Sequence, residues 1–144
     1  MGRMTLQQMR AEAKKHLTGY RRNCARAYKC PSRRMQDEWI EGWICAIDAA
    51  RAYFAATNPV KERFMCRLFG LESPVPRRQP TRERMIRLSI ELCVSESTLY
   101  KWREDIFEIV LYAAVEEGLL HPFGLKECAK RAKGEEIETK PGGD

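Results

Sequence analysis

The stretch LSIELCVSESTLYKW, at residues 88–102, is the most informative part of this chain of 144 residues. It predicts two helices joined by the three-residue turn Cys93-Val94-Ser95, because Ser95 is a typical N-cap for the second helix. Leu99 and Trp102 recur at helical spacing and would pack that helix on a core. Small Ser89 would let the two helices approach each other, with Val94 filling the angle between them.

The stretch lies in a longer run of helical patterns. Toward the C-terminus, the second helix continues to about Gly118. Toward the N-terminus, Thr81 is expected to cap the helix that leads into the turn. A linker with three prolines, residues 71–80, precedes it. Before the linker, Asn58-Pro59 is typical of a helix start and Gly70 of a helix end.

The first third of the chain is also helical in pattern. Apolar residues at helical spacing predict a helix over residues 33–56, and a basic helix is expected over residues 5–28, although Gly19 weakens its middle. No window alternates as a strand does. We therefore predict an all-α protein, with an N-terminal helical hairpin and a C-terminal helix-turn-helix unit that has a long recognition helix. The expected division is a basic N-terminal region for interaction or dimerisation (1–57), a helix-turn-helix domain (58–120) and a flexible charged tail (121–144).

The charge is unevenly distributed. The net charge is +6 and the isoelectric point is near 9.1, which favours nucleic acid first and acidic membrane second as partners. Residues 1–34 contain ten basic residues and a single acid, Glu12. This region is either a second phosphate-binding surface or a solvated face. A second basic group comprises Arg77, Arg78, Arg82, Arg84 and Arg87.

The six cysteines do not suggest disulfides or a metal site. No apolar signal segment precedes them, and no C-x-x-C pair provides zinc-ligand spacing. No run approaches the roughly 20 apolar residues of a membrane span. We therefore expect a cytoplasmic protein with free thiols, without a metal or cofactor and without a membrane association.

The pattern of residues 88–102 resembles the helix-turn-helix of bacterial regulators, whose usual form is close to I-A-x-x-L-G-V-S-x-S-T-V-Y-x-W. With residues 59–120 included, it looks most like the domain of sigma factors that reads the −35 promoter element. It is also similar to the small phage late-gene activators of the ArpU and RinA type. Two departures are Cys93, where glycine is usual, and Ser89, where alanine is usual.

The resemblance implies a transcription regulator that binds double-stranded DNA, with RNA polymerase as a further candidate partner. The N-terminal positions of a recognition helix reach base edges, while basic residues near the preceding helix hold phosphates. The residues expected at base edges are Glu96, Ser97, Thr98, Tyr100 and Lys101. Those expected at phosphates are Arg77, Arg78, Arg82, Arg84 and Arg103.

Other functions are less favoured by the sequence. The chain has no P-loop, nucleophile-elbow or H-E-x-x-H motif, so an enzyme is not expected. The alternative is the small, DNA-recognition subunit of a phage DNA-packaging machine, in which such units more often lie near the N-terminus. A helical scaffold that binds only protein is a third hypothesis, and a homo-oligomer is compatible with each. The pair Trp39 and Trp43 suits either a core or a partner interface.

Overall fold

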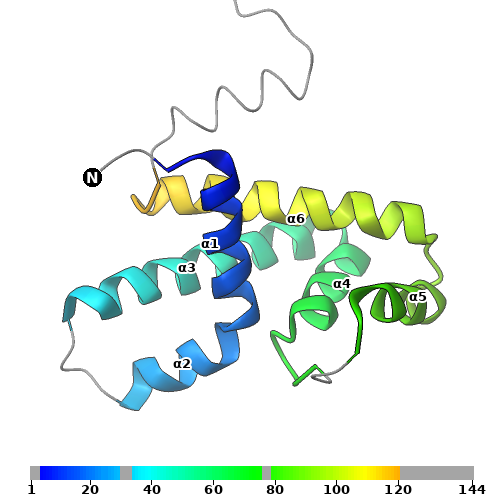
Figure 1. Cartoon of the computed structure of the whole chain (residues 1–144), viewed down its shortest axis with the longest axis horizontal. Helices are drawn as coiled ribbons and strands as arrows, with labels where there is room; N and C mark the ends of the chain where they lie inside the picture. Colours follow the sequence, from blue (N-terminus) through cyan, green and yellow to red (C-terminus); the bar gives the residue numbers. More distant parts are fainter. Residues whose placement is uncertain (1–3, 30–33, 76–78, 121–144) are drawn as a thin grey trace, which may run out of the picture.

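The part of the protein that the structure describes is a bundle of six α-helices (Figure 1). The computed structural model describes residues 4–29, 34–75 and 79–120. No strand occurs in those residues, so the all-α prediction is confirmed. The tail predicted at 121–144 lies outside them. The helices are α1 (Leu6–Thr18), α2 (Tyr20–Lys29), α3 (Arg34–Thr57), α4 (Pro59–Phe69), α5 (Thr81–Leu92) and α6 (Glu96–Glu116).

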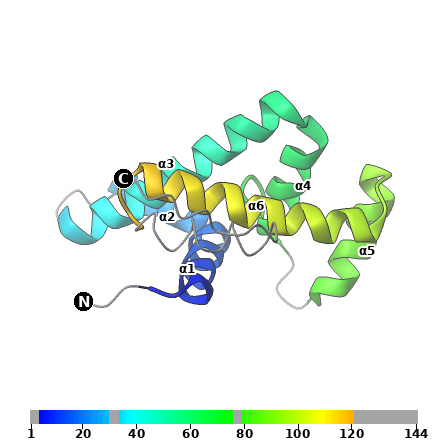
Figure 2. The ribbon, with the colours of Figure 1, turned by 90° about the horizontal axis from the view of Figure 1, so that it is seen from above.

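Two long helices, α3 and α6, form the centre of the bundle. They pack on each other, with α1 and α2 toward one end and α4 and α5 toward the other (Figures 1 and 2). The segment that follows α6 also packs closely on α3, because a Cβ on Gly42 of α3 would lie 2.7 Å from Cδ2 of Leu119. None of the helices in the described residues is long and apolar enough to cross a membrane.

One hydrophobic core joins the helices. Its largest fully buried side chains include Met9 of α1, Trp43 and Phe54 of α3, Phe64 of α4 and Leu99 of α6. Burial of large apolar side chains is the main favourable term in folding. The expected boundary after residue 57 falls between α3 and α4, and the helices on both sides of it contribute to the same core.

The helix predicted over residues 5–28 is two helices. Thr5 and Gln8 form a capping box that starts α1, as their reciprocal hydrogen bonds show. The helix then ends at Gly19, whose N–H is directed to the carbonyls of Leu17 and Lys15. Glycine in a helix interior is less favourable than alanine by about 1 kcal/mol, so the predicted helix is interrupted at this position.

The start and end of α4 are as the sequence predicts. The Asn58 side chain accepts a hydrogen bond from the N–H of Lys61 at 3.3 Å, and Pro59 occupies the first helical position. Gly70 ends the helix in the left-handed conformation with φ of 68°. A Cβ there would also lie 2.9 Å from Cγ2 of Val75, so glycine suits both the backbone and the space.

The start of α5 differs from the prediction. Pro80, and not Thr81, occupies the N-cap position, and its side chain offers no capping hydrogen bond. Pro80 is extended, and its carbonyl accepts the first helical bond from the N–H of Arg84 at 3.1 Å. A proline ring holds φ at a value that suits the N-cap position, so Pro80 takes that position. Thr81 is then the first residue of the helix.

Candidate nucleic-acid interface

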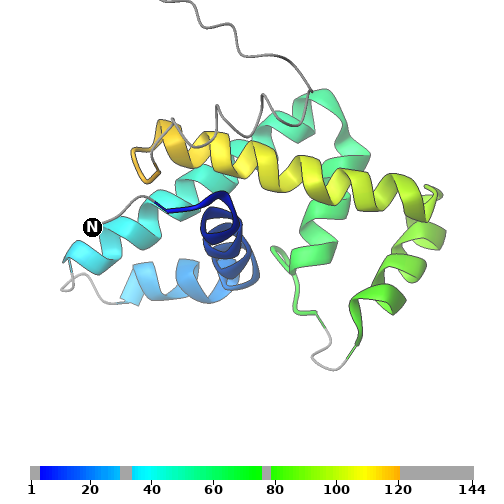
Figure 3. The ribbon, with the colours of Figure 1, turned by 45° about the horizontal axis from the view of Figure 1, so that its top comes forward.

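The connection between α5 and α6 is a tight turn fastened to Ser89. The carbonyl of Ser89 accepts hydrogen bonds from the N–H groups of Cys93 and Val94, and its hydroxyl donates to the carbonyl of Val94 at 2.6 Å. Cys93 adopts the left-handed conformation, with φ of 57° and ψ of 45°. These contacts hold α5 at an angle to the start of α6 (Figure 3). The turn at residues 93–95 is therefore confirmed.

Ser95 starts α6 as predicted. Its hydroxyl oxygen accepts from the N–H of Thr98 at 3.3 Å, and the hydroxyl donates to Oγ1 of Thr98 at 2.8 Å. An N-cap of this kind contributes about 1 kcal/mol and leaves the other first-turn N–H groups open. Thr98 is half-buried, because its side chain belongs to this cap.

The first turns of α6 present one polar face and one apolar face. Four of the five residues expected at base edges are exposed, namely Glu96, Ser97, Tyr100 and Lys101. On the opposite side Leu99 is fully buried. Trp102 is half-buried, and its ring centroid lies 6.0 Å from that of Phe64 on α4. The apolar face therefore anchors the helix while the polar face meets solvent.

The residues expected at phosphates have different environments. Arg82 is exposed in the first turn of α5. Arg84 is half-buried, and its Nη1 donates to the carbonyl of Leu68, near the end of α4, at 3.0 Å. Arg103 is half-buried, with its guanidinium carbon 5.9 Å from the ring centroid of Phe107. Arg77 and Arg78 lie outside the described residues.

The acids of α6 next to this face are paired with cations of other helices. Lys61 of α4 lies 2.7 Å from a carboxylate oxygen of Asp105, and Arg10 of α1 lies 2.5 Å from one of Glu104. Arg67 of α4 similarly pairs with Glu91 of α5. These pairs are partly exposed and stabilise the fold only modestly. They do reduce the negative charge close to the start of α6.

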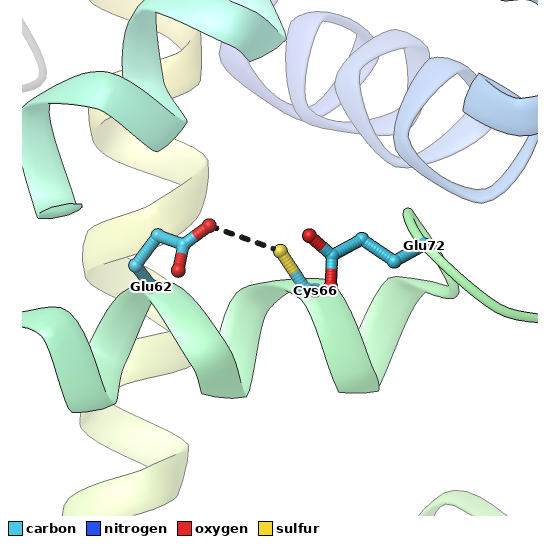
Figure 4. A group of neighbouring side chains, drawn as sticks. All are labelled: Glu62, Cys66 and Glu72. Carbon is cyan, nitrogen blue, oxygen red and sulfur yellow. Dashed lines mark hydrogen bonds between the residues drawn. The ribbon is translucent and has the colours of Figure 1, made fainter.

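A second cluster of chemically active groups lies where α4 meets the segment after it (Figure 4). One ligand atom from each of Glu62, Cys66 and Glu72 lies within 4.8 Å of the others, as in a metal site. However, the guanidinium of Arg51 on α3 already bridges the carboxylates, with Nη2 3.3 Å from Glu62 and 2.8 Å from Glu72. A cation of the protein therefore already pairs with both carboxylates and offsets part of their charge.

The thiol in this cluster is held in its protonated form. Burial first, and then the hydrogen bond from Sγ of Cys66 to Glu62 at 3.2 Å, raise the pKa of Cys66 to about 12. A thiol ligates metals and attacks substrates as the thiolate, so this environment disfavours both roles. Cys24, Cys45 and Cys93 are also free thiols, while Cys30 and Cys128 lie outside the described residues.

His16 is buried between α1 and α3. Its ring stacks on that of Trp43, with centroids 5.0 Å apart and planes at 4°, and it meets Trp39 edge-on at 6.2 Å. Among the residues that the structure describes, neither ring nitrogen has a partner in hydrogen-bond geometry, although Nε2 lies 3.3 Å from a carboxylate oxygen of Glu12. Burial lowers the pKa of His16 below its ordinary value despite that carboxylate. Trp43 therefore belongs to the core, and Trp39 packs against it.

Comparison with known proteins finds no match: no protein-family model, no curated protein and no solved structure is similar to this chain. The resemblance of residues 88–102 to bacterial regulators therefore stays a prediction based on the residues themselves.

Two features of the structure have no signal in the sequence. One is the contact of Arg84 with the end of α4, and the other is the network of Arg51 with Glu62, Cys66 and Glu72. In both, the partners come from different elements and their spacing matches no motif. Only the packing of α3, α4 and α5 brings them together.

Proposed function

We propose that the protein is a sequence-specific regulator of transcription that binds duplex DNA through α5 and α6 as a helix-turn-helix. The observation that carries this proposal is the start of α6, a helix fixed by its inner face while Ser97, Tyr100 and Lys101 point to solvent. Helix-turn-helix proteins insert such an N-terminal face into the major groove. The net charge of +6 supports a polyanionic partner.

The roles of the residues follow from their environments. Ser97 and Lys101 are four residues apart and exposed on one face, so both would meet base edges. Arg82 is exposed at the start of α5, where a helix crosses the DNA backbone, and would hold a phosphate. Glu96, Thr98, Tyr100 and Arg103 would complete the surface. Resemblance to the −35-reading domain of sigma factors makes a promoter-like site the expected target and RNA polymerase a further partner.

The test begins with selection of bound duplexes from a random pool, followed by affinity measurements on the selected duplex and on random duplex. Ser97→Ala and Lys101→Ala should each lower the ratio of specific to non-specific affinity by about 5- to 150-fold, the range for one base contact. Arg82→Ala should weaken both affinities alike and lower the salt slope by about one unit.

A matched control is Arg63→Ala, because Arg63 is an exposed cation on α4 outside the proposed surface. It removes the same charge as Arg82→Ala and should leave both affinities nearly unchanged. Failure of the pool to enrich any duplex would overturn sequence-specific binding. Equal effects of Arg63→Ala and Lys101→Ala would instead show that only overall charge matters.

A further inference from the structure

A basic cavity lies outside the proposed DNA-reading face. It has a volume of about 490 Å³ and is bordered by the start of α2, the end of α4, the segment after α4, and Arg84 of α5. Its charged lining among the described residues consists of Arg21, Arg22 and Arg84, without an acidic residue.

The arginines of this cavity are not neutralised by the rest of the protein. None of the three forms an ion pair with a carboxylate in the part of the chain that the structure describes. Arg21 and Arg22 are exposed in the first turn of α2, which contains no acidic residue.

Arg84 adds an unsatisfied donor. Its Nη1 donates to the carbonyl of Leu68, but its Nε is buried and has no hydrogen-bond partner within residues 4–29, 34–75 and 79–120. A buried donor left without a partner is unfavourable, and more so when the group is charged. An anion in the cavity would bring an acceptor to the guanidinium groups there.

We infer that this cavity binds a phosphate group. Two N–H groups of one guanidinium can donate to two oxygens of a phosphate at the same time. A phosphate has enough oxygens to accept hydrogen bonds from more than one arginine. The remaining lining includes apolar Leu68, Phe69 and Val75, and the volume is in the range of small-molecule sites. The cavity therefore has room for part of the molecule that carries the phosphate. That molecule is either a free phosphorylated compound or the backbone of bound DNA.

The binding test uses inorganic phosphate and the full chain. Phosphate is titrated against chloride at constant ionic strength, and the amide resonances are followed by NMR. Saturable shifts are expected around Arg21, Arg22 and Gly70. The double variant Arg21→Ala/Arg22→Ala should weaken phosphate binding at least tenfold, whereas Arg63→Ala should not. Shifts that do not saturate, or equal affinity in the double variant, would overturn the inference.

A second variant keeps the test independent of folding. Arg84→Lys retains the charge but removes Nε and the fork, so phosphate binding should weaken while the helical content stays unchanged. If phosphate binds Arg84→Lys as tightly as the original chain, the assigned role of Arg84 is wrong.

The two sources of phosphate are separated by competition. Adenosine 5′-monophosphate that binds more tightly than phosphate would identify a free compound as the ligand. Displacement of phosphate by the selected duplex would identify the DNA backbone. Only the competition with the selected duplex rests on the proposed function. Phosphate binding itself does not, because Lys101→Ala should reduce DNA specificity and leave phosphate binding intact.

Discussion

Cys93 has a strained backbone conformation. It is the one non-glycine residue with positive φ among residues 4–29, 34–75 and 79–120. An L-residue in the left-handed region costs about 1–2 kcal/mol, because its Cβ approaches a backbone carbonyl. The conformation is required for the turn that joins α5 to α6, so the protein accepts the cost at this position.

Replacement of Cys93 by glycine should therefore stabilise the protein. We expect Cys93→Gly to raise the free energy of unfolding by about 0.5–1 kcal/mol, since relief of strain is partly offset by the greater freedom of glycine in the unfolded chain. Urea unfolding measures the change. Cys93→Ala is the control, because it keeps the Cβ and should give no gain. An equal gain for alanine would show that the thiol, and not the backbone, is unfavourable.

His16 makes the stability depend on pH. Burial lowers its pKa in the folded state below the ordinary 6.5, so the unfolded chain binds a proton at a higher pH than the folded chain. The contribution is fully present above pH 6.5 and is lost as pH falls through the folded-state pKa. The free energy of unfolding should decrease by up to about 1.4 kcal/mol per pH unit in that window.

The variant His16→Phe isolates this effect. Phenylalanine retains an aromatic ring against Trp43 and has no titrating nitrogen, so the pH dependence below 6.5 should flatten. Chemical denaturation at a series of pH values provides the comparison. A slope that is unchanged in His16→Phe would assign the pH dependence to the carboxylates.

At the scale of the element, α6 depends on its buried face. Leu99→Ala should lower the free energy of unfolding by about 2–5 kcal/mol, because Leu99 is fully buried and the core cannot fill the space completely. Lys101→Ala, two residues away and exposed, should change it by less than about 0.5 kcal/mol. Thermal melting distinguishes them, and similar melting curves would mean that the face of α6 is assigned incorrectly.

The ends of the helices could be predicted where one residue determines the local backbone. Asn58, Gly70 and Ser95 act through their own side chain or conformation, and each lies at the predicted end. The break at Gly19 and the cap at Pro80 were not predicted. At both positions more than one residue could end or start the helix. Which residue does so depends on how the adjoining helix packs.

At the scale of the whole molecule, the shared core predicts a single unfolding transition. Side chains of α1, α3, α4, α5 and α6 belong to one cluster, so separate melting of the regions before and after residue 58 is not expected. In Trp102→Phe, fluorescence reports only Trp39 and Trp43 on α3, while circular dichroism reports all helices. The two signals should give the same urea midpoint, and distinct midpoints would indicate two independent units.

Contacts between helices were the feature least predictable from the sequence. The sequence predicts the apolar and polar faces of α6, so the exposure of Ser97 and Lys101 was accessible from their spacing. It does not predict that Arg84 reaches Leu68 or that Arg21 lines the same cavity, because these residues are far apart along the chain. Their proximity follows from the angles between helices, which local patterns do not determine.

The length of α6 has a mechanical consequence. The helix is uninterrupted over 21 residues and therefore roughly 30 Å long. Leu119, three residues past its far end, lies beside Gly42 of α3, while its near end presents Ser97 to solvent. A rigid rod of this length amplifies small rotations, so a tilt of about 5° at the α3 contact would displace the near end by roughly 3 Å. A molecule that binds the distant half of the bundle could thus move Ser97 out of register with a base pair without touching it.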